Sequence, residues 1–428
     1  MKLVFEDIDK PNGVDGTVEF GLIYWEYEDT CDKISVQQIE DDIQKCFYLV
    51  EPTGGVNRIL ESGFEFTRNM SETILKHIQN GKCFLVISSM SEGYLENNHL
   101  KKIHEVLDSK KIPPKQVIFI QSNYNLENQY KYVCDRYNIK DSINLITTQH
   151  KLETSVESYR NLINENWNYN EYPQRPSINL WEDVKEIRGN LRDYYYLSYN
   201  KTLRPDRVVL LSLLLKNNLI KKGLVSIGSK EYGSTGKQNW PDEFDFIDEK
   251  LDEVEEWSNK LKRLQPLSVD GEPSVDSMDE GKYKGLNVCG YTYGEQFRRV
   301  YFMVVTEDVF NSESMFFSQT TYKPIVSLTP FIMFGSPYMM KNLREVQGFK
   351  TFSPWIDESY DEEENHEKRL YMIVDEIKRL CNIPRKEMNE WYFEMKDILI
   401  HNQNHLLNFK LSDYDKIYDL VYKKIFIK

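Results

Sequence analysis

Two apolar runs in the first third of the chain end in small polar residues, and a helix-like segment separates them. The runs are GKCFLVISSMSEGY at residues 81–94 and KQVIFIQSNYN at residues 115–125, with HLKKIHEVLDSKK between them. A strand, a helix and a second strand in this order favour parallel strands joined by a crossover. The sequence therefore predicts an α/β fold with a parallel sheet.

The polar residues that follow the two runs are the first candidate site residues. In an open parallel sheet the ligand crevice lies beyond the carboxyl ends of the strands. The residues at these ends are Ser88, Ser89, Ser91 and Glu92 after the first run, and Ser122 and Asn123 after the second.

Length and composition set broad limits on the fold and the compartment. A chain of 428 residues, 40% hydrophobic and 29% charged, fits two packed domains better than one core. No apolar run approaches the ~20 residues of a membrane span, and the first residues lack the pattern of a secretory signal. The six cysteines form no CxxC pair, so neither a zinc knuckle nor a disulfide framework is indicated. We expect a chain without a membrane span in a reducing cytoplasm.

A second strand–helix–strand unit follows a polar, aromatic connection at residues 164–181. DYYYLSYN reads as a strand, KTLRP as a loop and DRVVLLSLLLKNNLIKKG as a helix, with Asp206 near its start and Gly223 just past its end. GLVSIG would be the next strand. The nearby GSKEYGST resembles a phosphate loop, but Ser234 stands where that loop requires lysine, so we reject it.

A polar cluster lies between two apolar segments further along the chain. RRVYFMVVTEDVF (residues 298–310) predicts a strand with an acidic end, FFSQTTYKP (316–324) opens a helix, and PFIMFG (330–335) is the next buried strand. A helix start with free N–H groups and a nearby lysine suits an anion, and a carboxylate at the same edge suits sugar hydroxyls. The pattern predicts a nucleotide-sugar pocket formed by Glu307, Ser318, Gln319, Thr320 and Lys323.

The order of these segments resembles the glycosyltransferases of the two-Rossmann (GT-B) type, especially a fucosyltransferase-like and exostosin-like group found in bacteria and their viruses. The donor domain of that group has a strand with an acidic end, then F-T-E-K-T-x-K-P, P-F-x-x-F-G and L-R-E-x-G-F-K-T-F. This chain has VVTED, FFSQTTYKP, PFIMFG and LREVQGFKTF, followed by WIDESYDE. YNKTLRPDRVVLLSLL and ILIHNQNHLL extend the likeness over most of the second half, whereas the first half matches only in layout.

The resemblance implies two Rossmann-like domains that face a cleft. Residues 1–170 would form the N-terminal acceptor domain, residues 171–390 the nucleotide-sugar donor domain, and residues 391–428 C-terminal helices able to pack back on the first domain. It also implies a nucleotide-sugar donor, no metal or other cofactor, and a cytoplasmic location, in the host cell if the chain is viral. The acceptor would be a glycan or a hydroxylated nucleobase, and the net charge of -14 favours the glycan.

The chain departs from the group at two positions. Gln319 and Thr320 stand where the group carries glutamate and lysine. An amide still binds two ribose hydroxyls, but it lacks the charge assistance that makes such hydrogen bonds roughly twice as strong. Glu307 or Lys323 can compensate. The alternative function is therefore a binding or virion-associated protein that kept the fold without catalysis.

For the donor diphosphate, the resemblance and the strand-to-helix loop indicate Asn200, Lys201, Arg204 and Arg207. Arginines clamp a diphosphate bidentately and stabilise the departing nucleotide without a metal. The structural alternative is that both arginines only pair with acidic residues. No DxD motif is well placed for a metal, because DID at residues 7–9 precedes the first expected strand and DYD at residues 413–415 lies in the tail.

An inverting reaction needs a general base from the first domain. Glu92 is the candidate, with Glu28 or Asp29 as the alternative, and a solvated turn is the non-catalytic interpretation. His401 and His405 stand four residues apart but lack the glutamate of HExxH, so a packing or capping role is favoured. The predicted catalytic residues of this metal-independent glycosyltransferase are Glu92, Arg204 and Arg207.

Overall fold

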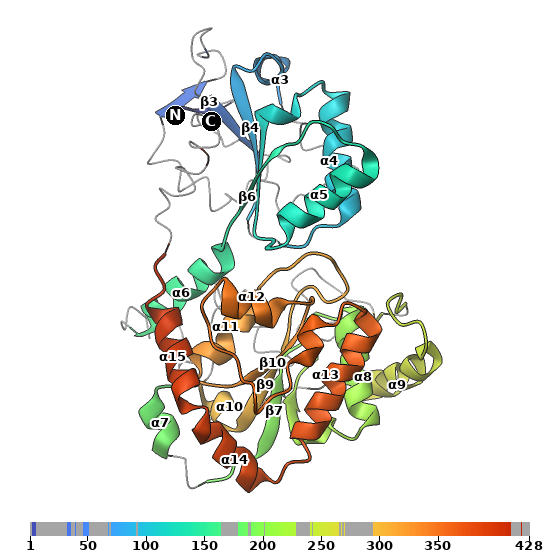
Figure 1. Cartoon of the computed structure of the whole chain (residues 1–428), viewed down its shortest axis with the longest axis vertical. Coiled ribbons are helices and arrows are strands. Elements are labelled where there is room, and N and C mark those ends of the chain that lie inside the picture. Colours follow the sequence, from blue (N-terminus) through green and yellow to red (C-terminus); the bar gives the residue numbers. More distant parts are fainter. Residues whose placement is uncertain are drawn as a thin grey trace. The chain divides into compact units, whose positions relative to one another are not determined.

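The computed structural model describes residues 2–5, 32–35, 39, 46–50, 67, 70–90, 93–163, 179–186, 190–200, 202–227, 240–241, 243–264, 267, 269, 294–411 and 421. They fall into two compact units, which are described separately. Unit 1 contains the described residues of Met1–Lys151, Ser312–Phe316 and Lys410–Lys428, and unit 2 contains those of Leu152–Asn311 and Phe317–Phe409. In Figure 1 most of unit 1 is blue to cyan, and unit 2 runs from green to red.

Unit 1 is built on a parallel sheet of six strands in the order β2-β1-β3-β4-β5-β6. The strands are β1 (Lys2–Phe5), β2 (Asp32–Ser35), β3 (Cys46–Val50), β4 (Cys83–Ser89), β5 (Val117–Gln121) and β6 (Asn144–Thr147). The helices are α3 (Glu72–Gln79), α4 (Asn97–Ser109) and α5 (Leu126–Tyr137), with a 3-10 turn at Pro114–Gln116. The two strands and the intervening helix predicted in this region are confirmed as β4, α4 and β5.

The start of the chain differs from the sequence-based expectation. The DID motif at residues 7–9 was expected to precede the first strand, but β1 already forms at Lys2–Phe5 and pairs with β2 and β3. The four residues of β1 are too short a run to show a periodic pattern, and their pairing partners are far away in the sequence. Residues 7–9 themselves lie outside the described part of the chain.

Unit 2 is built on a parallel sheet of four strands in the order β10-β9-β7-β8. The strands are β7 (Tyr194–Ser198), β8 (Gly223–Val225), β9 (Val300–Thr306) and β10 (Phe331–Phe334). The helices are α6 (His150–Ile163), which begins at the boundary between the units, α7 (Trp181–Glu186), α8 (Pro205–Lys216), α9 (Leu251–Arg263), α10 (Gly294–Arg298), α11 (Gln319–Val326), α12 (Met339–Glu345), α13 (His366–Leu380), α14 (Arg385–Glu394) and α15 (Lys396–Leu407). Short 3-10 turns lie at Ile220–Lys222 and Ser359–Glu362.

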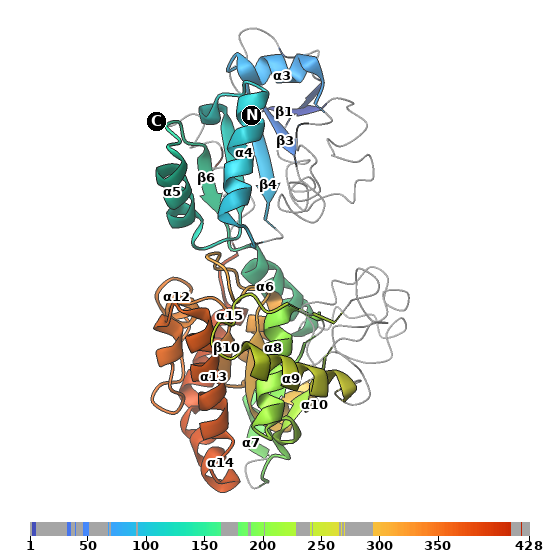
Figure 2. The same ribbon diagram turned by 90° about the vertical axis from the view of Figure 1, so that its right-hand side faces the viewer.

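Helix α8 is almost wholly buried. All residues from Asp206 to Leu214 are buried, and the helix packs against both α9 and α13, which lie beside it in Figure 2. It is shorter than the sequence suggested, because it ends at Lys216 and not just before Gly223. Asn218 has a left-handed backbone (φ 57), which ends the helix, and a separate 3-10 turn follows.

Both units are Rossmann-like, because parallel strands alternate with helices in each. The predicted α/β class with two such domains is therefore confirmed, and the strands predicted in the second half correspond to β7, β8, β9 and β10. No helix among the described residues is long and apolar enough to cross a membrane.

Candidate functional site

The carboxyl ends of the parallel strands of unit 2 bring together most of the residues singled out in the second half. Strands β7 and β9 are neighbours at the centre of the sheet. Asn200 follows the end of β7, and Glu307 and Asp308 follow the end of β9. Helix α8 begins close to this edge, because its first residues contact the loop after β9. This edge is where an open α/β sheet binds ligands.

Arg207 is a buried anchor at this edge. Its Nη2 donates to the carbonyl oxygens of Thr306 (3.1 Å) and Glu307 (3.3 Å) and to Oδ1 of Asp308 (3.0 Å). The side chain is only 7% exposed. Arg207 therefore fixes the position of the loop after β9 relative to α8.

Arg204 contacts the same loop but faces solvent. It is the N-cap residue of α8, directly before Pro205. Its Nη2 lies 3.2 Å from Oδ1 of Asp308, its Nη1 donates to the carbonyl oxygen of the same residue, and its side chain is 38% exposed. The Asp308 carboxylate thus pairs with both arginines, of which only Arg204 is open to solvent.

Several buried polar atoms at this edge have no hydrogen-bond partner among the described residues. They include the Nε atoms of Arg204 and Arg207, Oδ1 of Asn200 and Oγ of Ser226. Nδ2 of Asn200 donates to Ser198 Oγ (3.0 Å) and to the Ser226 carbonyl oxygen (3.1 Å), so its Oδ1 is held in a fixed position. Buried groups of this kind are rare in native proteins and call for a specific explanation. Here they offer N–H donors and fixed acceptors at one edge.

The buried Asp206 carboxyl in the first turn of α8 has one unpartnered oxygen among the described residues. Burial raises its pKa, and the positive charges of Arg207 and Arg204 act in the opposite direction. Removing either cation would therefore leave this carboxyl less well compensated.

Glu307 holds the start of α11. It has no solvent exposure; one carboxylate oxygen accepts from the backbone N–H of Ser318 (2.9 Å), and the other accepts from the hydroxyl of Thr321. Ser318 in turn caps the helix by accepting from the N–H of Thr320 (3.1 Å). The sequence placed Glu307 at the ribose of a donor, but both of its oxygens are engaged inside the unit. The hydroxyls of the FFSQTTYKP segment therefore help to join α11 to the end of β9.

The titration of Glu307 gives a testable pH dependence. Burial, helped by the charge of Asp308, raises the pKa of Glu307, although hydrogen bonds from Thr321 and Ser318 act against the shift. A carboxyl whose folded-state pKa is raised stabilises the fold below its unfolded pKa of about 4.3, and this contribution is lost as the pH rises through the folded pKa. Relative to Glu307→Gln, the wild-type free energy of unfolding should therefore fall over this window. Urea titrations of both proteins from pH 4 to 8 measure this change. A wild-type free energy of unfolding that rises with pH relative to Glu307→Gln would contradict the raised pKa of Glu307.

The other predicted residues of α11 are buried or half-buried. Gln319, the first residue of the helix, is 9% exposed, and Thr320 is half-buried. Lys323 is 2% exposed, and its Nζ lies 6.0 Å from the ring centroid of Tyr199. The Tyr199 hydroxyl donates to Gln296. The lysine therefore lies inside the unit, near the residue that follows β7.

The predicted residues of unit 1 that the structure describes are all buried, and Ser88 Oγ has no hydrogen-bond partner among the described residues. Ser88 and Ser89 are buried at the end of β4. Ser122 Oγ donates to the Met90 carbonyl oxygen (2.6 Å), and Asn123 Oδ1 accepts from the N–H groups of Asn125 and Met315 (both 2.9 Å). Glu92, Ser91, Lys201, Glu28 and Asp29 lie outside the described residues.

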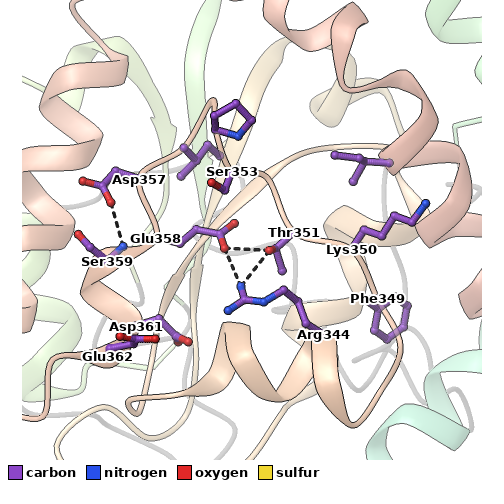
Figure 3. Close-up of a pocket in the computed structure, with 13 residues that line it drawn as sticks. Arg344, Phe349, Lys350, Thr351, Ser353, Asp357, Glu358, Ser359, Asp361 and Glu362 are labelled. Carbon is purple, nitrogen blue, oxygen red and sulfur yellow. Dashed lines mark hydrogen bonds and ion pairs between the residues drawn. The ribbon is translucent and has the colours of Figure 1, made fainter.

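A cavity of about 940 Å³ lies in unit 2 beside the loop between α12 and α13 (Figure 3). At its centre Arg344 Nη1 donates to Glu358 (2.7 Å) and to Thr351 Oγ1 (2.9 Å). The cavity is lined by Arg344, Phe349, Lys350, Thr351, Ser353, Pro354, Ile356, Asp357, Glu358, Ser359, Asp361, Glu362 and Ile398. These residues include four of the ten in LREVQGFKTF and six of the eight in WIDESYDE, so the motif that carried part of the resemblance contributes charges of both signs to the cavity.

Glu358 organises this loop, and its removal should be costly. Its carboxylate accepts from Arg344, from Thr351 Oγ1 (2.8 Å) and from the N–H of Phe352 (2.6 Å), and its side chain is 9% exposed. We expect Glu358→Ala to lower the free energy of unfolding by about 2–4 kcal/mol, because it leaves three donors without their acceptor. Urea denaturation measures the change. The exposed Glu362→Ala is the control with an expected change below about 0.5 kcal/mol, and equal effects of the two variants would contradict this role.

The two histidines on α15 take part in packing. Nε2 of His405 lies 2.7 Å from the carbonyl oxygen of Gln347, and its ring stacks on His401 at 5.9 Å. The packing role favoured by the sequence is therefore confirmed for His405. Among the described residues, no three His, Cys, Asp or Glu side chains are grouped so that they could hold a metal ion.

Two residues of the sheet edge were missed as functional candidates. Asp308 was seen only as part of an acidic strand end, and Thr321 was not singled out. The signal for Asp308 was present, because an acid at the end of one strand and arginines after the neighbouring strand meet at the same edge of a parallel sheet. No comparable signal identifies Thr321, since its contact with Glu307 depends on how α11 docks.

Comparisons with known proteins give similarities in structure only. The sequence matches no protein-family model and no curated protein. Among solved structures, this chain is similar to a UDP-forming α,α-trehalose-phosphate synthase from Burkholderia xenovorans, with a TM-score of 0.36, 10% identity, and 87% of this chain and 74% of that chain covered. It is also similar to the trehalose-phosphate synthase from Burkholderia vietnamiensis, with a TM-score of 0.34, 10% identity, and 89% of this chain and 71% of that chain covered. The trehalose 6-phosphate synthase from Burkholderia multivorans has a TM-score of 0.34 and 8% identity, with 89% of this chain and 72% of that chain covered. The assignment of two Rossmann-like units stands on the strand order of this chain itself.

Proposed function

We propose that this chain is a glycosyltransferase that moves a sugar from a nucleotide-sugar donor to a hydroxyl acceptor, and that unit 2 binds the donor. One observation carries the proposal. Arg204 presents a partly exposed guanidinium at the carboxyl edge of the sheet, where Asp308 and the start of α8 fix its position. A guanidinium at this place suits a diphosphate, since it binds two phosphate oxygens at once.

The remaining groups at the edge support a nucleotide diphosphate. The unpartnered Nε atoms of Arg204 and Arg207 are donors, which phosphate oxygens can satisfy, and Oδ1 of Asn200 is an acceptor, which a ribose hydroxyl can satisfy. The start of α8 adds the positive end of a helix dipole. As the sugar leaves, these groups would stabilise the negative charge that develops on the nucleotide diphosphate.

The acceptor and the general base remain part of the proposal. A glycan fits the net charge of -14 better than DNA carrying a hydroxylated nucleobase. For an inverting reaction Glu92 is the proposed base, with Glu28 or Asp29 as the alternative, and Lys201 is a further phosphate ligand. These four residues lie outside the described part of the chain. We also propose that transfer needs no bound metal.

A second candidate function is a binding protein that kept the fold without catalysis. Two features favour it. Gln319 and Thr320 replace the glutamate and lysine of the group that the sequence resembles, and Glu307 is fully buried with both of its oxygens bonded to α11.

Release of sugar from a donor, with and without an acceptor, separates the two functions. We expect slow hydrolysis of one donor among UDP-, GDP-, ADP- and CMP-sugars, measured as free nucleotide diphosphate (or CMP) by chromatography, and loss of this activity in Arg204→Ala. Donor binding without release in the presence of candidate glycan acceptors would favour the binding protein. Neither binding nor release would overturn both.

A further inference from the structure

A second cavity, of about 540 Å³, lies in unit 2 between the turn before α9 and the first turns of α13. The proposed donor site does not use any of its residues. The cavity is lined by Asp248, Glu249, Lys250, Glu363, Asn365, Glu367, Lys368 and Tyr371. Four carboxylates therefore face two ammonium groups.

Glu367 places an unsatisfied acceptor in this cavity. Its Oε2 accepts from the backbone N–H groups of Asp248 (2.9 Å) and Glu249 (3.0 Å), which fixes the carboxylate against the turn before α9. Its Oε1 is buried and has no hydrogen-bond partner among the described residues, and the residue is only 9% exposed. A buried, ionisable oxygen without a donor is costly and requires an explanation.

A second unsatisfied atom lies one helical turn further along α13. The hydroxyl of Tyr371 is buried and has no partner among the described residues. Burial raises the pKa of Tyr371, and the negative charges of Glu253, Glu367 and Glu249 raise it further. Residues four apart on a helix share one face, so the two unsatisfied oxygens lie on the same side of α13.

The two lysines of the cavity already have partners. Nζ of Lys368 pairs with the carboxylate of Glu363, and Nζ of Lys250 lies 4.1 Å from the centroid of the Tyr371 ring. Neither Glu367 nor the two acids before α9, Asp248 and Glu249, form an ion pair with a described residue. The cavity therefore has an excess of negative charge and acceptor atoms.

We propose that this cavity binds an organic ammonium ion of the polyamine type, which donates N–H groups to Glu367 Oε1 and to the Tyr371 hydroxyl. The acids before α9 would attract a second amine of the same ligand. An amine fits better than a metal ion, because no three carboxylates or other ligands among the described residues converge on one point. A primary ammonium, by contrast, needs only separate acceptors at hydrogen-bond distance.

Calorimetric titration of the full chain with spermidine tests the proposal. We expect saturable binding at low salt that weakens as salt is added, and about 10-fold or greater loss of affinity in Glu367→Gln. The glutamine keeps an oxygen for the two backbone N–H groups and replaces the free acceptor with a donor. Tyr371→Phe, which keeps the ring under Lys250, should weaken binding several-fold.

Asp375→Asn is the matched control, because it removes one exposed charge from the same helix at a residue that does not line the cavity. It should bind spermidine as the wild type does, and 1,6-hexanediol, which has no charge, should not bind. Absence of spermidine binding would show that the cavity holds only water. Equal affinities of wild type and Glu367→Gln would place the amine elsewhere on the acidic surface, and competition by equimolar Mg²⁺ would indicate a metal site; each result overturns the proposal.

Discussion

Arg207→Ala is expected to lower the free energy of unfolding by about 3–5 kcal/mol, enough to unfold much of unit 2 near physiological temperature. The substitution removes the donor shared by the Thr306 and Glu307 carbonyl oxygens and the Asp308 carboxylate. It also removes the one of the two positive charges that has the larger effect on the buried Asp206 carboxyl. Urea denaturation followed by circular dichroism measures the loss.

Arg207→Lys is the informative companion, because an ammonium keeps the charge but cannot reach three acceptors with the planar geometry of a guanidinium. It should recover about half of the lost stability. If Arg207→Ala folds as stably as the wild type, Arg207 is not the anchor that the structure indicates.

Arg204→Ala should weaken donor binding strongly and change the stability of the fold only slightly. The side chain is 38% exposed and its ion pair is at the surface, so the free energy of unfolding should fall by no more than about 1 kcal/mol. Affinity for the nucleotide-sugar should fall about 10- to 150-fold, because a charge-assisted hydrogen bond to phosphate contributes about 1.5–3 kcal/mol. Calorimetry with the cognate donor measures the affinity.

Arg204→Lys should restore only part of the affinity, since lysine binds phosphate as a point charge and not through two parallel N–H groups. If Arg204→Ala destabilises the chain as strongly as Arg207→Ala and leaves the affinity for the nucleotide-sugar unchanged, Arg204 has a structural role and not a donor-binding role.

The sequence predicted the elements of the second half well because each has a strong local signal. Strand β9 is a continuous apolar run with an acidic end, and α8 begins at a proline and continues as an apolar segment. Parallel strand order then places Arg204, Arg207 and Glu307 at one edge, as expected from the chain alone.

The division of roles among these residues could not be predicted. Arg204 and Arg207 lie three apart at the start of one helix, and only the packing of α8 decides that one is buried and the other exposed. Glu307 and Asp308 are adjacent, yet the first supports α11 and the second pairs with both arginines. Such differences depend on which way each side chain leaves the end of a strand, since successive residues point to opposite faces.

Local sequence patterns also do not predict which unit contains the segment between β9 and α11. The sequence predicts it as part of the second domain, whereas Ser312–Phe316 belongs to unit 1. There Ser314 Oγ donates to the carbonyl oxygen of Leu95 (2.7 Å), and the N–H of Tyr124 donates to the carbonyl oxygen of Met315 (2.8 Å). Phe316 packs so closely on Gly93 that a Cβ there would collide with its ring. These contacts join residues about 190 to 220 positions apart in the sequence, which no local pattern reveals.

The donor site at the sheet edge of unit 2 is tested most directly by thermal stabilisation of the full chain with UDP-, GDP-, ADP- and CMP-sugars, with Arg204→Ala beside the wild type. A ligand that binds only the folded state raises the melting temperature by mass action, and at about 100 times Kd it adds about 2.7 kcal/mol. We expect a rise of several degrees with one nucleotide-sugar and little or none in Arg204→Ala. No rise with any of the four at millimolar concentration would contradict a donor site at the sheet edge of unit 2.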